Sequence, residues 1–204
     1  MNLYISLFAL GAYLLGAIPT GLVLARLFCA TDIRAGGSGN IGATNVVRLL
    51  GRRLGALTLL GDWLKGFLPV YIGAQLFTDA AGGSDYTALS IFGLAAFLGH
   101  LFSVYLKFKG GKGVATAFGV FAFLAPALLA LVLVLFVIIV AVSRYVSLAS
   151  LSAAALLPLL LIGFSYPLPV IAMGICMVLL IFIKHKNNIQ RLLQGTENKQ
   201  VFAQ

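Results

Sequence analysis

The amino-acid sequence predicts an all-α, polytopic integral membrane protein with about seven short transmembrane helices in a single domain, residues 1–204. Apolar residues make up 61% of the chain, charged residues make up only 9%, and the mean hydropathy is +1.08. A soluble domain carries about 25% charged residues, so this composition excludes a soluble globule. The formal net charge of +9 indicates basic loops on the cytoplasmic side of a membrane, and no nucleic-acid partner is expected.

The predicted spans follow the apolar runs of the sequence, because a crossing needs a nearly continuous apolar stretch. The first run is long enough to span and lacks the basic start of a cleavable signal peptide. In chain order the predicted spans cover residues 3–27, 55–77, 86–105, 114–142 (two crossings), 148–164 and 168–183.

Two spans contain residues that need an explanation. In the first, Gly16, Pro19 and Gly21 permit a kink or a close helix contact. In the second, Asp62 and Lys65 are three positions apart and share one helical face. Charges inside a membrane are costly, so they form either a mutually neutralising structural pair or part of a catalytic site. A short loop at 78–85 follows this span and contains Asp79.

The run at 114–142 is interpreted as two crossings that turn near Ala125 and Pro126. A single crossing would leave the basic C-terminal tail outside, against the positive-inside rule. The same rule puts the basic segments in the cytoplasm and therefore the N-terminus outside, and two crossings bring Arg144 and the C-terminus to the cytoplasmic side. Each crossing would have about 14 residues, or about 21 Å, which is short of a hydrocarbon core of about 30 Å. A thinned or protein-shielded region, or a re-entrant hairpin, would accommodate them.

A glycine-rich segment, GGSGNIGATN at 36–45, is the most informative polar stretch. Glycine lets successive backbone N–H groups face a common point, and such a nest binds anions, especially where a helix begins just beyond it. The hydroxyls of Ser38 and Thr44 can donate to the same oxygens, and Arg48 can contact two of them. The alternative is a flexible polar linker between two helices.

Further basic segments are expected on the same cytoplasmic face. KFKGGKG at 107–113 brings three lysines and two flexible glycines, and a polar break at Ser143 and Arg144 brings a hydroxyl and a guanidinium. Beyond the last span, a helix continuing from it would place His185 and Asn188 on one face. Many cations and amides with few carboxylates are typical of a phosphate site and leave a divalent metal without ligands.

The GGKG sequence does not predict a nucleotide site. A Walker A loop needs a glycine five residues before its Gly-Lys pair and a hydroxyl directly after the lysine. Leu106 and Gly113 occupy those positions. The two cysteines, Cys29 and Cys176, have no metal-binding spacing and are interpreted as free structural thiols.

The polar segments resemble the signature motifs of a known family, the bacterial membrane acyl-phosphate:glycerol-3-phosphate acyltransferases of the PlsY type. The resemblance covers essentially the whole chain. It rests on SGNIGATN at 38–45, on Gly99-His100 followed by KFKGGKGVAT at 107–116, on His185 with Asn188, Arg191-Leu192, Gly195 and Glu197, and on Ser143-Arg144-Tyr145.

The resemblance implies that the acyl group of a long-chain acyl phosphate passes to the 1-hydroxyl of sn-glycerol-3-phosphate. The products would be lysophosphatidate and inorganic phosphate, in phospholipid biosynthesis. Because acyl phosphate is already an activated mixed anhydride, no cofactor, metal, nucleotide or coenzyme A is expected. The implied location is the bacterial cytoplasmic (inner) membrane, with the active site on the cytoplasmic side. A monomer in contact with membrane lipid is expected, and docking of the soluble enzyme that makes acyl phosphate is left open.

Roles for individual residues are hypotheses at this point. The catalytic set is expected to be Ser38, Arg48, Lys107, His185 and Asn188. The donor phosphate is expected at Ser38, Gly39, Asn40, Gly42, Ala43, Thr44, Asn45 and Lys112, and glycerol-3-phosphate at Arg48, Lys107, Ser143, Arg144, His185 and Asn188.

Three further assignments concern the histidines and the tail. Either His185 or a substrate phosphate oxygen accepts the proton of the acceptor hydroxyl. His100 is interpreted as a structural hydrogen bonder. Lys112 can serve either phosphate. Arg191 and Glu197 are interpreted as bracing the tail.

Two other functions were weighed. A transporter for a phosphorylated metabolite would suit short, broken helices with the charges of Asp62 and Lys65, but its charges would lie at the midplane and not on one side. An acyltransferase of the His-x-x-x-x-Asp type is excluded, because Tyr105 follows His100 at the required spacing and Gln190 follows His185.

Overall fold

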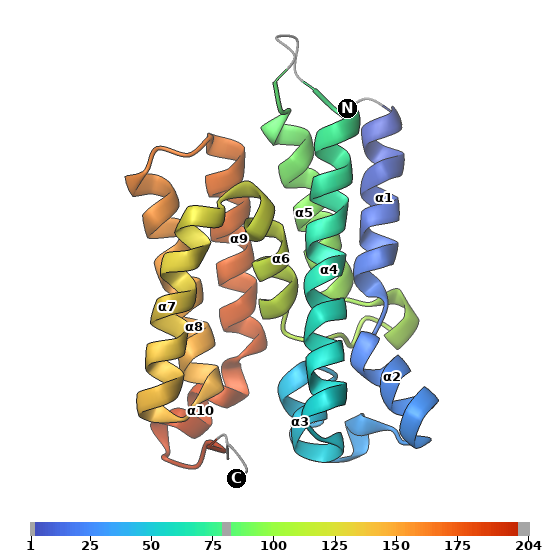
Figure 1. The fold of residues 1–204 in the computed structure, drawn as a ribbon, viewed down its shortest axis with the longest axis vertical. Coiled ribbons are helices and arrows are strands. Elements are labelled where there is room, and N and C mark those ends of the chain that lie inside the picture. Colours follow the sequence, from blue (N-terminus) through green and yellow to red (C-terminus); the bar gives the residue numbers. More distant parts are fainter. Residues whose placement is uncertain (1–2, 79–82, 200–204) are drawn as a thin grey trace. The chain divides into compact units, whose positions relative to one another are not determined.

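The computed structural model describes residues 3–78 and 83–199, and within them it is built from ten α-helices and two short 3₁₀ helices. Asp79, predicted in a loop, lies outside the described residues. The chain divides into two compact units, residues 1–124 and 125–204 (Figure 1). That the two units act as a single domain remains a prediction.

Unit 1, residues 1–124, packs long helices side by side and carries two irregular polar loops. Helices α1, α4 and α5 pack against one another, and α6 packs along α4 (Figure 1). The elements are α1 (Leu3–Ala17), α2 (Thr20–Cys29), η1 (Ile33–Ala35), α3 (Ala43–Leu50), α4 (Arg52–Leu76), α5 (Tyr86–Leu101), η2 (Val104–Leu106) and α6 (Val114–Leu124).

The first apolar run bends between α1 and α2, where the sequence permits a kink. The two helices differ in direction by 43°, and the break falls at Pro19, which has no N–H for a helical hydrogen bond. Side chains from elsewhere in the unit satisfy the carbonyls at the break. Ser103 Oγ donates to Ala17 O at 2.5 Å, and Lys65 Nζ donates to Ile18 O at 3.0 Å.

Glycines allow the helices of unit 1 to approach closely. A Cβ on Gly16 of α1 would lie 2.0 Å from the backbone oxygen of Ala96 in α5, and a Cβ on Gly66 of α4 would lie 2.0 Å from that of Thr116 in α6. Small residues at helix contacts are typical of membrane proteins, in which close packing replaces the hydrophobic effect between helices.

The charged pair predicted in α4 is present and buried. Lys65 Nζ lies 2.8 Å from Asp62 Oδ1, and both side chains are 4% exposed. His100 of α5 approaches the same carboxylate, with Nδ1 3.8 Å from Oδ1. The pair is mutually neutralising, as one of the two interpretations of these residues required.

Unit 2, residues 125–204, consists of α7 (Pro126–Ser143), α8 (Val146–Gly163), α9 (Leu168–Lys184) and α10 (Lys186–Leu193). The predicted break near Ala125 and Pro126 is confirmed, with Pro126 at the first turn of α7. The helices on either side have 11 and 18 residues and not about 14 each. The prediction of one helix through His185 was wrong: α9 ends at Lys184, and α10 is bent from it by 60°.

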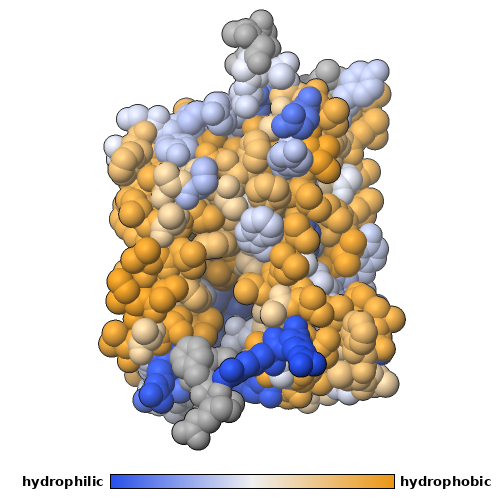
Figure 2. Space-filling view, in the orientation of Figure 1, coloured by the Kyte–Doolittle hydropathy of each residue, from blue (hydrophilic) through white to orange (hydrophobic). Residues whose placement is uncertain are grey.

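The composition of the helices agrees with membrane insertion. In the described part of the chain three helical segments are long and apolar enough to cross a membrane, or five if each bent pair is one span. Figure 2 shows that apolar side chains cover much of the surface seen in that view. Leu27, Val134 and Leu159 are among the exposed apolar residues. The count of seven spans and their orientation remain predictions.

Candidate active site

The glycine-rich segment folds as a loop between η1 and α3. Gly37 and Gly39 adopt positive φ angles of 59° and 67°, which carry no steric cost in a residue without Cβ. Gly42 precedes α3, and Asn40 Oδ1 accepts a hydrogen bond from Gly42 N at 2.9 Å. The loop is therefore an ordered turn and not a flexible linker.

Asn45 is the residue that holds this loop in shape. Its side chain is buried, and its Nδ2 donates to the carbonyl oxygens of Ile33 at 3.0 Å and Asn40 at 2.9 Å, with a longer contact to Gly36 at 3.3 Å. Its Oδ1 accepts from Ser38 N at 2.9 Å. Both polar atoms of the amide are thus engaged by the loop backbone, which gives Asn45 a positioning role beside the phosphate-binding role expected for it.

The groups left for an anion lie at the start of α3. In the described chain no hydrogen bond uses the backbone N–H of Ala43 or of Thr44, as is usual in a first helical turn. Ser38 is exposed and Thr44 is half-buried. Arg48 is exposed on α3, and its Cδ would lie 3.5 Å from a Cβ on Gly37. These donors, together with the positive end of a helix, favour a phosphate at this position.

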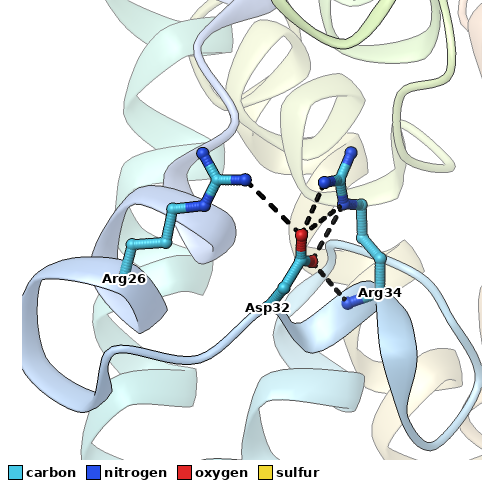
Figure 3. A network of polar contacts seen from close by, with 3 residues as sticks. All are labelled: Arg26, Asp32 and Arg34. Atoms are coloured by element: carbon cyan, nitrogen blue, oxygen red, sulfur yellow. Dashed lines mark hydrogen bonds and ion pairs between the residues drawn. The ribbon is translucent and has the colours of Figure 1, made fainter.

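Asp32, at the entrance to the loop, lies between two arginines (Figure 3). Its carboxylate accepts from Arg34 Nε at 2.9 Å and from Arg26 Nη2 at 3.4 Å, and it caps η1 through Arg34 N at 3.0 Å. The hydrogen bonds from the Arg34 side chain and backbone hold the pKa of Asp32 well below its usual range. Asp32 therefore stays ionised and fixes the start of the glycine-rich loop.

The lysine loop at 107–113 lies next to the glycine-rich loop through a shared apolar cluster. Leu106, directly before Lys107, packs in one buried cluster with Ile33, Ile41 and Val46, residues of the glycine-rich loop and its flanks. Two of the predicted phosphate-binding segments are thus brought together in unit 1. In this loop Lys107 has a φ of 51°, so the chain turns sharply at the lysine.

Unit 2 brings the remaining predicted residues. Ser143 Oγ donates to Ile139 O at 2.6 Å and accepts from Tyr145 N at 3.1 Å, while Arg144 ends α7 with a φ of 61° and is exposed. Ser143 therefore shapes the turn that presents Arg144.

His185 lies at the bend between α9 and α10, Asn188 lies in α10, and both are buried. His185 Nδ1 lies 2.8 Å from Ile181 O. Since a carbonyl oxygen only accepts, the neutral imidazole carries its proton on Nδ1 and its lone pair on Nε2. Asn188 Nδ2 donates to Glu197 Oε1 at 2.7 Å.

Glu197 ties the tail to two helices. Its carboxylate accepts from Asn188, from Ser147 Oγ at 2.7 Å and from Arg191 Nε at 2.7 Å. Ser147 of α8 was missed by sequence reasoning, because nothing in the sequence links residues 50 positions apart.

Glu197 is expected to stay ionised, and to keep its hydrogen bonds, at mildly acidic pH. Burial raises the pKa of Glu197, but the hydrogen bonds from Asn188, Ser147 and Arg191 outweigh burial and lower it below its ordinary 4.5. A carboxylate with a lowered pKa stabilises the fold above its unfolded pKa and loses that contribution as the pH falls through the folded one.

Glu197 is the only glutamate in the chain, so carboxyl ¹³C labelling of glutamate gives one resonance that reports this pKa directly. We expect a midpoint below 4.5, raised in Arg191→Met. A midpoint at or above the ordinary value in the unmodified protein would contradict the cluster.

Comparison with known proteins decides the family. The model of the family described as glycerol-3-phosphate acyltransferase matches residues 6–195. The chain belongs to the glycerol-3-phosphate acyltransferase family. Two curated glycerol-3-phosphate acyltransferases support this. The protein of Trichlorobacter lovleyi is 50% identical to this chain, and the match covers 93% of this chain and 94% of that protein. The protein of Syntrophotalea carbinolica is also 50% identical, and the match covers 97% of each.

Two solved structures of an acyltransferase of this kind are similar to the chain. Both are crystal structures of PlsY (YgiH), an integral membrane glycerol 3-phosphate acyltransferase. The glycerol 3-phosphate form is 42% identical with a TM-score of 0.90, covering 97% of this chain and 96% of that one. The lysophosphatidic acid form is 41% identical with a TM-score of 0.87, covering 96% and 95%.

Proposed function

We propose that the protein transfers the acyl group of a long-chain acyl phosphate to the 1-hydroxyl of sn-glycerol-3-phosphate, giving lysophosphatidate and inorganic phosphate. Glycerol-3-phosphate as the acceptor and lysophosphatidate as the product follow from membership of the family, and one of the similar structures is a lysophosphatidic acid form. The observation that supports an acyl-phosphate donor is the glycine-rich loop, which has positive φ angles at Gly37 and Gly39, leads into the start of α3 and lies next to the lysine loop. Such a loop suits an anion, and the sequence has no nucleotide-binding motif at the lysine loop.

In the proposed reaction the acceptor oxygen attacks the acyl carbonyl carbon and the bond from that carbon to the phosphate oxygen breaks. The loop from Ser38 to Thr44, with Lys112, binds the donor phosphate and stabilises its charge as it leaves. The proposed acceptor site comprises Arg48, Lys107, Ser143, Arg144, His185 and Asn188. We further propose that the protein is a monomer of the bacterial cytoplasmic membrane with its site on the cytoplasmic side.

The proposal is tested by phosphate release from palmitoyl phosphate by purified protein in lipid mesophase, with and without glycerol-3-phosphate. We expect release that requires the acceptor, yields lysophosphatidate, and needs no added coenzyme A, nucleotide or metal. Lysophosphatidate formed only from acyl-coenzyme A would overturn the donor assignment and leave the family activity intact.

A Ser38→Ala variant is expected to lower acceptor-dependent release by about 10- to 100-fold. Its hydroxyl would donate to the charged phosphate, and a hydrogen bond to a charged group contributes about 1.5–3 kcal/mol. The backbone N–H of Ser38, which holds the loop through Asn45, is retained in the variant, so the loop fold is not disturbed. Unchanged kinetics in Ser38→Ala would exclude the hydroxyl from the donor site, and Ser165→Ala, a serine remote in sequence from the motifs, serves as the matched control.

A further inference from the structure

The buried charges of α4 connect to the lysine loop through His100. Asp62 lies between Lys65 and His100, at 2.8 Å and 3.8 Å, and all three side chains are 4% exposed. These residues belong to none of the expected substrate contacts. Replacing a buried ion pair by packed apolar side chains often leaves the stability of a fold unchanged or raises it. Stability alone therefore does not account for the charges of Asp62 and Lys65.

At one end this network reaches the break in the first apolar run. Lys65 Nζ donates to Ile18 O at the bend between α1 and α2. Ser103, which precedes the lysine loop, donates to the adjacent carbonyl of Ala17. Lys65 and Ser103, which precedes the lysine loop, therefore both donate to carbonyls at the break, on adjacent residues.

At the other end the network reaches the lysine loop itself, which folds back against the last turn of α5. Gly111 N donates to His100 O at 3.0 Å, and Gly110 N donates to Leu101 O at 3.2 Å. A Cβ on Gly111 would lie 2.2 Å from His100 Nε2. The imidazole thus faces Asp62 with Nδ1 and the loop backbone with Nε2, and Lys112 is the next residue along the chain.

We propose that Asp62, Lys65 and His100 form a positioning network that fixes the lysine loop, so that Lys107 and Lys112 face the substrate phosphates. The carboxylate of Asp62 lies beside the imidazole, and the imidazole lies against Gly111. The backbone carbonyls of His100 and Leu101 hold Gly111 and Gly110 against α5. The role assigned to the lysines rests on the proposed function. The position of the loop does not depend on it.

The experiment compares an Asp62→Asn/Lys65→Met double variant and His100→Leu with the unmodified protein. The double variant removes both charges together and so leaves no unpaired charge in the interior. Hydrogen exchange is followed across 107–113, and kcat and KM for glycerol-3-phosphate are measured on folded, monodisperse protein. We expect exchange in this loop to rise by about tenfold or more while α4 and α5 stay protected, and kcat/KM to fall by about 100-fold, as small displacements of substrate-binding groups do.

Two variants separate positioning from simple stabilisation. His100→Asn retains an amide close to the position of Nδ1 and is expected to recover part of the loop protection and of kcat/KM. Ser90→Ala removes a buried hydroxyl of α5, for which the described chain shows no hydrogen bond, and is expected to leave loop protection and kcat/KM unchanged.

Equal loss of protection in the loop and in α4 and α5 would overturn the proposal, as would unchanged kinetics with an unprotected loop. If the unmodified protein transfers no acyl group, the proposed function fails, and hydrogen exchange alone decides whether the network positions the loop.

Discussion

His185→Ala is expected to lower kcat/KM for glycerol-3-phosphate by at least about 100-fold, since positioned proton acceptors contribute about 10²–10⁴-fold. The contact of Nδ1 with Ile181 O puts the imidazole lone pair on Nε2. That atom can accept the proton of the attacking hydroxyl or hold the hydroxyl while a substrate phosphate oxygen accepts it. The division of the loss between kcat and KM, measured by phosphate release across pH, separates these roles.

A loss confined to kcat, together with loss of the acid limb of the pH profile, would identify His185 as the base. A loss confined to KM would identify it as an acceptor contact, with the proton passing to phosphate. His185→Asn retains an amide toward Ile181 O without a basic nitrogen and should behave like the alanine variant. Near-normal kinetics in both variants would remove His185 from the site.

Asn45→Asp is expected to lower acyl transfer by at least about 100-fold although the two side chains have the same shape. A carboxylate cannot donate, so the buried carbonyl of Ile33 and the half-buried carbonyls of Gly36 and Asn40 would lose their donor. A buried acceptor left without a donor costs about 1–3 kcal/mol, and that of Ile33 is in a buried hydrogen bond. The loop would then open and its N–H groups would no longer converge.

The comparison variant is Asn40→Ala, which removes the single hydrogen bond that Gly42 N donates to the Asn40 side chain. This variant should lose far less acyl-transfer activity. Hydrogen exchange over 33–45 measures the loop, and phosphate release measures activity. Retained activity in Asn45→Asp would show that the amide does not hold the loop.

The sequence predicted those features of the fold that depend on neighbouring residues. Apolar runs located the helices, and Pro19 and Pro126 marked two breaks because proline lacks an N–H. Asp62 and Lys65 were placed on one face by their spacing. The bend at His185 was not predicted, because neither proline nor glycine stands there.

What the sequence could not give was the partner of each polar group. Asn45 has the same donors whether they face a phosphate or the carbonyl of Ile33, and only the folded loop decides between them. The link from Ser147 to Glu197 joins residues that no local pattern connects. For the same reason, the sequence indicated that Arg48 and Lys107 belong to phosphate-binding segments but not that Leu106 packs beside the glycine-rich loop.

The separation of the two units along the chain has a consequence for biosynthesis. All contacts of the glycine-rich and lysine loops described above lie within residues 1–124, whereas the cluster around Glu197 closes on Ser147 near the other end of unit 2. At about 5–20 residues per second, translation from Leu124 to Glu197 takes roughly 4–15 s. Unit 1 can therefore complete both loops co-translationally, several seconds before Glu197 has been synthesised.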